Sequence, residues 1–316
     1  MKEVLAGRYQ LLAVVGTGGT ARVYRSLDTR LDRIVAVKLL AAPSLAAGKK
    51  LVQDAELQRR VDHPHVCRIY ESGWDEHGAP YVVMELIEGE SLAQRAPLLT
   101  IGEKVSAVRD AALGVQAAHE AGLIHLDLRP RNILLERATS RPVLTGFLDL
   151  EVSLSASTGA AIGTPNSMAP EQVRGDLQAL GPHTDVYGLG ATLYELLSGA
   201  PPFHGATRME VLERVVRDDP APLDPALPAA LRAIVGRAME KDPARRIRGA
   251  RALADELQGF LQGRPPPVPE PAWARRKPFW IGIALGLTLA AAGAWLVVDS
   301  LRTTSGPDRA AKRAAP

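Results

Sequence analysis

The segment HLDLRPRN, residues 125–132, places a carboxylate at Asp127 and an amide at Asn132, five positions apart. The apolar run 133–135 follows directly and is typical of a buried strand, so both polar side chains are expected in the loop before it. In such a loop the carboxylate can orient an attacking hydroxyl while the amide oxygen binds Mg²⁺. The segment therefore predicts a site for phosphate chemistry.

A glycine-rich segment and a lysine lie upstream of this loop. The segment VGTGGTARVY, residues 15–24, puts small residues between two expected strands, where backbone N–H groups can approach phosphate oxygens closely. Lys38 follows fifteen residues after Val23, at the end of the apolar run 35–37, which would bring its ammonium group beneath that segment. Each feature alone is weak, because glycine-rich hairpins and solvated lysines are common.

The pattern of apolar residues changes along the chain. The first ninety residues alternate short β-branched runs, such as 33–40 and 81–86, with turns, and one helix is expected near 47–60. From about residue 100 the pattern favours longer helices, which are expected at Glu103–Ala121, Thr184–Ser198, Met209–Arg217, Pro228–Glu240 and Ala250–Leu261. The chain is therefore expected to fold as α+β, with a β-rich lobe, an α-rich lobe and a cleft between them.

Three further segments point to one family. The segments GTPNSMAPE, residues 163–171, and TDVYGLG, residues 184–190, resemble the substrate-binding segment and the central helix of protein kinases. The segment KDPARR, residues 241–246, resembles the region whose arginine pairs with the glutamate of the first. The loop at 125–132 alone is shared with phosphotransferases of small molecules, but all these features occur in order over residues 9–262. The chain therefore resembles the eukaryotic-like bacterial serine/threonine protein kinases.

The resemblance implies a two-lobed protein kinase fold, with an N-lobe at 9–86, a C-lobe at 87–262 and ATP between them. It gives catalytic roles to Asp127, Lys38, Arg129 and Asn132. It also implies that one set of residues binds the nucleotide, with Ala36 against the adenine: Val15, Gly16, Gly18, Gly19, Val23, Ala36, Lys38, Met84, Glu85 and Leu86.

Further roles are structural. The resemblance implies that Asp185 ties down the backbone of the catalytic loop and that Arg246 pairs with Glu171. Asp54 stands where the family has a glutamate that pairs with the strand lysine, and its side chain is one methylene shorter. Glu56 lies about 200° around the helix from Asp54 and is expected to face elsewhere. The ion pair that positions Lys38 is therefore in doubt.

The metal-binding triplet Asp-Phe-Gly of the family is not intact. The alignment that fits best puts Gly146, followed by Phe147, where the aspartate should be, which removes the principal ligand of Mg²⁺. A second alignment reads residues 149–151 as the triplet, at the expense of a longer hairpin after Leu135. Asp149 would then bind metal together with Asn132.

Regulation by activation-loop phosphorylation is not supported, because Leu126 replaces the arginine that responds to this phosphorylation in the family. The candidate phosphate acceptors are Ser157, Thr158 and Thr164. Two hypotheses remain open. The first is a pseudokinase that binds nucleotide weakly or not at all and signals through partner proteins. The second is a working serine/threonine kinase that uses Asp127 as base and Asn132 with Asp149 for metal.

Composition sets further limits. The chain has 38 basic and 35 acidic residues spread along its length, so the sequence shows no basic cluster that would indicate nucleic-acid binding. Cys67 is the single cysteine, which excludes an internal disulfide and suits a reducing compartment. Because it lies in an apolar run, Cys67 is expected to be a buried strand thiol rather than a nucleophile.

A membrane span is expected near the C-terminus. Residues 279–298 are 20 consecutive uncharged residues, long enough to cross the hydrocarbon core of about 30 Å as a helix, with Trp280 and Trp295 near its ends. A proline-rich and basic linker at 263–278 precedes this run, and a short polar tail at 299–316 follows it.

The expected location is the cell membrane, with a single pass and the kinase-like domain in the cytoplasm. Basic residues flank both sides of the span, so their count does not set its orientation. The N-terminus shows no export signal, and the domain would need intracellular nucleotide. The expected contacts are therefore cytoplasmic protein substrates or partners, and membrane lipid around 279–298. Gly282 and Gly286 form a small-xxx-small pair that would suit a dimer.

Overall fold

The computed structural model describes residues 4–17, 21–40, 45–147 and 165–264, which all belong to one compact unit, residues 1–266. The expected span at 279–298 and the tail at 299–316 lie outside the described residues. Among the residues that are described, no helix combines the length and the apolar character needed to cross a membrane.

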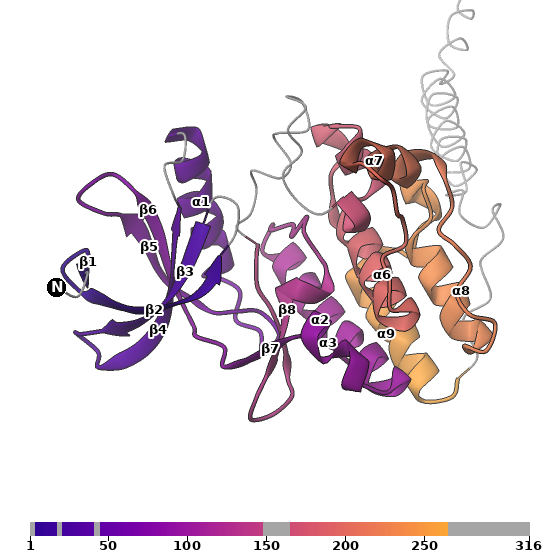
Figure 1. The fold of residues 1–316 in the computed structure, drawn as a ribbon, viewed down its shortest axis with the longest axis horizontal. Coiled ribbons are helices and arrows are strands. Elements are labelled where there is room, and N and C mark those ends of the chain that lie inside the picture. The colour runs from indigo at the N-terminus through magenta and orange to yellow at the C-terminus, as the bar shows by residue number, and fades with distance from the viewer. Residues whose placement is uncertain (1–3, 18–20, 41–44, 148–164, 265–316) are drawn as a thin grey trace, which may run out of the picture. The chain divides into compact units, whose positions relative to one another are not determined.

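An antiparallel sheet with one helix forms the N-terminal lobe, at the left of Figure 1. Its strands run in the order β1-β2-β3-β4-β6-β5. The strands and the helix have these bounds: β1 Val4–Leu5, β2 Tyr9–Thr17, β3 Ala21–Asp28, β4 Arg33–Leu40, β5 Ile69–Trp74, β6 Pro80–Met84 and α1 Leu45–Gln58.

The two faces of β4 have different neighbours because successive side chains of a strand point to opposite sides. Val35 and Val37 are fully buried in one apolar cluster with Tyr9 and Tyr81. Lys38 points to the other face, and its backbone lies opposite Val23 of β3. The antiparallel pairing of β3 with β4 thus brings the lysine to the strand that follows the glycine-rich segment.

Helices make up most of the C-terminal lobe, which also holds a small sheet with strand order β7-β8-β9. In the lobe α6 contacts α3, α8 and α9, and α3 packs along α9 (Figure 1). The main elements are β7 Gly89–Ser91, α2 Leu92–Arg95, α3 Ile101–Glu120, β8 Ile133–Glu136, β9 Pro142–Leu144, α5 Pro170–Val173, α6 Pro182–Ser198, α7 Arg208–Arg217, α8 Ala229–Ala238 and α9 Gly249–Leu261.

Local sequence explains where the central helices begin. A reciprocal capping box starts α3: Thr100 accepts a hydrogen bond from the backbone N–H of Glu103, whose carboxylate accepts one from the backbone of Thr100. Helix α6 begins with Pro182 in its first turn and is buried along most of its length. Because α6 is apolar on nearly all sides, it forms the centre of the lobe.

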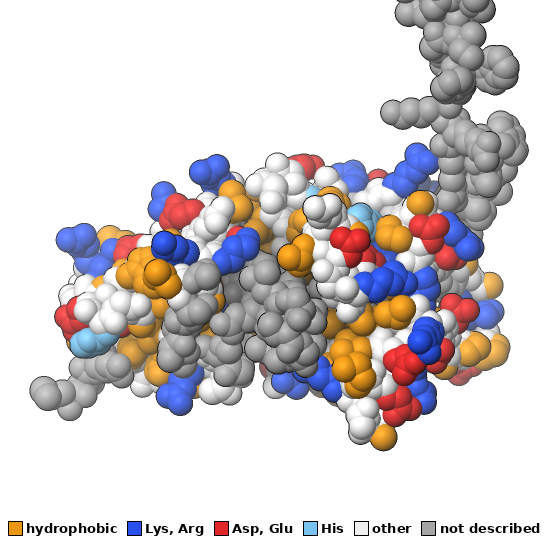
Figure 2. Space-filling view, turned by 90° about the horizontal axis from the view of Figure 1, so that it is seen from above, with side chains coloured by type: hydrophobic (Ala, Val, Ile, Leu, Met, Phe, Trp, Pro, Cys, Tyr) orange, Lys and Arg blue, Asp and Glu red, His pale blue; other side chains and the backbone are white. Residues whose placement is uncertain are grey.

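The expected order of a β-rich lobe and a helical lobe is confirmed. Each expected helix is present within about two residues of its expected bounds. The run at 81–86 is a shorter strand than expected, since β6 ends at Met84 and Glu85 follows it outside any strand. Basic and acidic side chains are interspersed on the face shown in Figure 2, as the balanced composition indicates.

Candidate active site

The loop at 125–132 brings its carboxylate and its amide into direct contact. The side-chain nitrogen of Asn132 donates to Asp127 Oδ2 at 2.7 Å and to the Asp127 carbonyl at 2.8 Å. Arg129 Nε lies 3.3 Å from the same Oδ2. Asp127 and Asn132 are both buried, and a short 3-10 turn at Pro130–Asn132 folds the loop back so that they meet. Three of the four predicted catalytic residues therefore lie together.

The first turn of α6 fixes the shape of this loop. The Asp185 carboxylate accepts the backbone N–H groups of His125 and Leu126 at 2.9 and 2.8 Å. Leu126 has a φ of 63°, a conformation that costs a non-glycine residue about 1–2 kcal/mol. Gln172 also donates to the Leu126 carbonyl at 2.8 Å. Asp185 thus has the contacts that the resemblance implies for it.

Gly146 lies beside Asn132. The backbone N–H of Thr145 donates to the Asn132 carbonyl at 2.9 Å, and Phe147 is buried against His125 with ring centroids 4.3 Å apart. A Cβ atom at Gly146 would lie 3.1 Å from Asn132 Cγ, and the φ of Gly146 is +89°. This is the arrangement of the first alignment, in which Gly146 takes the place of the metal-binding aspartate. Asp149, which the second alignment uses, lies outside the described residues.

The described residues here do not fit a Mg²⁺ site. Mg²⁺ requires several oxygen ligands in near-octahedral geometry, usually with one or two carboxylates. Gly146 supplies no side-chain oxygen, and the Asp127 carboxylate already contacts Asn132 and Arg129. Within the part of the chain that the structure describes, no group of three or more His, Cys, Asp or Glu side chains could hold a metal ion.

A cleft of about 850 Å³ runs beneath β2 and β3. This volume is within the range of small-molecule sites. Most of the predicted nucleotide-binding residues line it: Val15, Gly16, Val23, Ala36, Met84, Glu85 and Leu86. Gly18 and Gly19 lie outside the described residues, and Lys38 is buried in β4 and is not part of the lining. The lining also includes Thr145 and Arg131, which are the chain neighbours of Gly146 and Asn132.

Cys67 also lines this cleft. Its thiol is buried and lies 3.6 Å from the Glu85 carbonyl, to which it can donate. Burial, together with the charge of Glu85, raises the pKa of the Cys67 thiol to about 12. The thiol is therefore neutral near pH 7. Cys67 is buried as expected, but it lies before β5 and outside any strand, so its placement in a strand was wrong.

Asp54 pairs with a lysine other than Lys38. The Asp54 carboxylate is buried and its Oδ1 contacts Lys50 Nζ, one helical turn away on α1. Its Oδ2 has no hydrogen-bond partner among the described residues. Burial raises the pKa of Asp54 although Lys50 opposes the shift. Glu56 faces elsewhere, as predicted, and accepts a hydrogen bond from Ser72.

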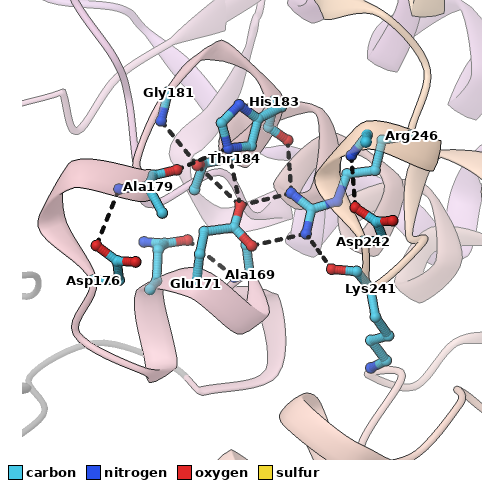
Figure 3. Close-up of polar contacts among 12 residues, drawn as sticks. Ala169, Glu171, Asp176, Ala179, Gly181, His183, Thr184, Lys241, Asp242 and Arg246 are labelled. Carbon is cyan, nitrogen blue, oxygen red and sulfur yellow. Dashed lines mark hydrogen bonds and ion pairs between the residues drawn. The ribbon is translucent and has the colours of Figure 1, made fainter. Parts of the chain in front are cut away.

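A buried ion pair joins α5 to the segment before α9 (Figure 3). Arg246 Nη1 and Nη2 donate to Glu171 Oε1 and Oε2 at 2.6 and 2.8 Å, and Thr184 donates to Oε1 at 3.0 Å. Burial by itself would raise the pKa of Glu171, but the hydrogen bonds and charge of Arg246 outweigh it, so the pKa is lowered. Arg246 also donates to the carbonyls of His183 and Lys241.

Sequence reasoning did not find some residues of this network. His119 Nε2 lies 2.7 Å from Asp185 Oδ2, and Gln172 reaches the catalytic loop. The partner of His119 is 66 positions away, so no local spacing could indicate the contact. Gln172 directly follows Glu171 in a segment that was already singled out, which was the one available indication.

Comparisons with known proteins agree on one family. A family model described as "Protein kinase domain" matches residues 9–257. The serine/threonine-protein kinase PknA of Mycobacterium tuberculosis is 32% identical over 279 residues, which cover 84% of this chain and 64% of PknA. For PknB of the same organism the identity is 33% over 284 residues, with 84% of this chain and 45% of PknB covered. The chain thus spans less than two thirds of the length of these relatives.

A solved structure shows the same fold. The crystal structure of the kinase domain of Mycobacterium tuberculosis PknI, determined for a mutant form, superposes with a TM-score of 0.67 at 24% sequence identity. The superposition covers 83% of this chain and 98% of that domain.

Proposed function

This chain belongs to the protein kinase domain family, among the eukaryotic-like serine/threonine kinases of bacteria, and we propose that it is a membrane-anchored signalling protein of that family. In this proposal it binds ATP in the cleft between its lobes, and its transfer of phosphate to protein hydroxyls is impaired. Nucleotide binding is supported by the residues that line the cleft and by the family's general use of ATP.

The observation that carries the impairment is the position of Gly146 beside Asn132. In this family a metal ion held there would supply positive charge against the charge that develops during transfer. Losing one preorganised electrostatic contact of this kind costs about 10²- to 10³-fold in rate. A chain without the carboxylate is therefore expected to transfer phosphate very slowly.

A transfer assay tests this proposal. The full chain, kept in mild detergent, would be incubated with labelled ATP and a generic basic protein, in Mg²⁺ or Mn²⁺, beside Asp127→Asn. We expect no transfer above that of the variant with either metal. Transfer that is lost in Asp127→Asn would show a working kinase.

A second candidate function, an active kinase, is favoured by the arrangement of Asp127, Asn132 and Arg129. A scaffold would not need a carboxylate held by an amide and a guanidinium. In that case Asp149 would supply the missing metal ligand, and Asp149→Asn should abolish the transfer that the parent chain shows.

The membrane anchor is also part of the proposal. It is supported by the uncharged run at 279–298 and by the basic and proline-rich segment before it. Deleting 279–298 should move the chain from the membrane to the soluble fraction of cells, whereas a chain that stays with the membrane without this run would contradict the anchor.

The small-xxx-small pair is tested by Gly286→Leu, which should abolish dimerisation that depends on the span.

A further inference from the structure

Positive charge gathers at the end of the cleft that adjoins the catalytic loop. Arg131 lines the cleft and its side chain is exposed. Among the described residues it forms no hydrogen bond and no ion pair, so its guanidinium is available to a ligand in the cleft. Arg129 lies on the same loop.

Within the described part of the chain, few negative charges lie near these cations. Glu195 of α6 is the described carboxylate on which both arginines act: burial raises its pKa, and the charges of Arg129 and Arg131 lower it. Asp127 contacts Arg129 through Oδ2. Glu85, one of the two acids in the cleft lining, lies 4.0 Å from Arg141. Among the described residues that line the cleft, three are arginines, Arg25, Arg131 and Arg137, and two are acids, Glu85 and Glu88.

The same region is poor in ligands for a metal. The amide nitrogen of Asn132 donates to Asp127 Oδ2 and to its carbonyl, which leaves Asn132 Oδ1 as the oxygen that this side chain could offer to a metal. Gly146 contributes no carboxylate at this place. A nucleotide that enters here meets the guanidinium of Arg131, and among the described residues no group of three or more His, Cys, Asp or Glu side chains could hold Mg²⁺.

We propose that the cleft binds ATP or ADP without a divalent cation, and that Arg131 neutralises part of the phosphate charge in place of the metal. This inference rests on the proposed nucleotide binding and names the form of the ligand. A guanidinium suits the task because it stays protonated and can donate two parallel hydrogen bonds to phosphate oxygens. The arginine binds the phosphates and supplies no step of transfer.

Calorimetry on the full chain in mild detergent tests the inference. ATP and ADP would be titrated once in EDTA and once in excess Mg²⁺. The inference predicts binding in EDTA with a Kd within about threefold of that in Mg²⁺. Binding in Mg²⁺ alone would overturn it and leave the proposed ATP site intact. Absence of binding under both conditions would instead overturn the proposed ATP site itself.

Two variants with the same change of charge separate the role of Arg131 from that of overall charge. Arg131→Gln should weaken binding in EDTA by about five- to tenfold, because a charge-assisted contact with phosphate is lost. Arg217→Gln removes one positive charge from the exposed face of α7, where Arg217 pairs with Glu213, and should leave the Kd unchanged. Equal affinities of Arg131→Gln and the parent chain would contradict the role of Arg131.

Discussion

The buried ion pair between Glu171 and Arg246 links α5 to the segment before α9. Arg246→Met would leave the Glu171 carboxylate buried without its cation. Breaking a buried pair from one side costs about 3–5 kcal/mol, so we expect a loss of this size in the free energy of unfolding measured with urea. Removing both charges, in Glu171→Gln with Arg246→Met, should cost less than Arg246→Met alone. A single variant as stable as the parent chain would contradict the structure here.

The same pair predicts how stability depends on pH. The pKa of Glu171 is lowered in the folded chain from its ordinary value of 4.5. A carboxyl group of this kind contributes stability above its unfolded pKa and loses it as the pH falls through the folded pKa. The free energy of unfolding should therefore fall as the pH decreases below about 4.5. Glu171→Gln should show a shallower fall over the same pH range, and an identical slope would exclude the contribution of Glu171.

At the scale of single residues, the sequence predicted a contact where the family motifs include both residues that form it. Glu171, Arg246 and Asp185 have the contacts that the resemblance implies. The partner of Asp54 could not be foreseen. Lys50 lies one turn away on the same helix, and the rotamer of Asp54 decides whether its carboxylate meets Lys50 or Lys38. The short side chain of Asp54 reaches the next turn of its own helix more easily than it reaches Lys38 on β4.

Helix α1 is held to the N-terminal sheet by a close contact at Gly48. A Cβ atom there would lie 2.5 Å from Trp74 Cη2 and 3.2 Å from Pro80 Cγ, so the absence of a side chain lets the ring pack on the helix. Gly48→Ala should destabilise the chain by about 1–3 kcal/mol through overpacking.

A matched control makes this test specific. Gly236 lies within α8 and has nothing within 4 Å of the position of its Cβ. Gly236→Ala should therefore stabilise the chain by about 0.5–1 kcal/mol, as expected for alanine in an open helical position. If both substitutions changed the urea midpoint in the same direction, the contact between Gly48 and Trp74 would not constrain α1.

At the scale of elements, periodicity predicted the long helices and the strands of the first lobe. The small sheet β7-β8-β9 was missed as a sheet, although the apolar run at 133–135 was recognised. Its strands have three or four residues, which is too short for an alternating pattern to stand out. Their pairing joins Gly89–Ser91 to residues more than forty positions away, and no local rule indicates such a contact.

For the whole molecule, the order of the motifs predicted two lobes with a cleft, and the comparisons confirm the fold and the family. The charge of the cleft was not predicted. Arg25, Arg131 and Arg137 come from three separate segments of the chain, and folding brings all three into the lining of the cleft. The departure at Gly146 was visible in the sequence, while its contact with Asn132 required the structure.

Replacement of Gly146 tests the proposed impairment directly. Asp and Asn are the residues other than glycine that best tolerate a positive φ, so Gly146→Asp and Gly146→Asn should fold alike, each at a cost of about 1–2 kcal/mol. The two variants differ in whether residue 146 carries a carboxylate or an amide. If both variants failed to fold, neither would show a cooperative unfolding transition in urea.

The decisive measurement is the rate of Mg²⁺-dependent phosphate transfer from ATP in the parent chain, Gly146→Asp and Gly146→Asn. If the missing carboxylate causes the impairment, Gly146→Asp should transfer phosphate at least about tenfold faster than the other two, which should be equally slow. A parent chain that already transfers phosphate as fast as Gly146→Asp would contradict this explanation.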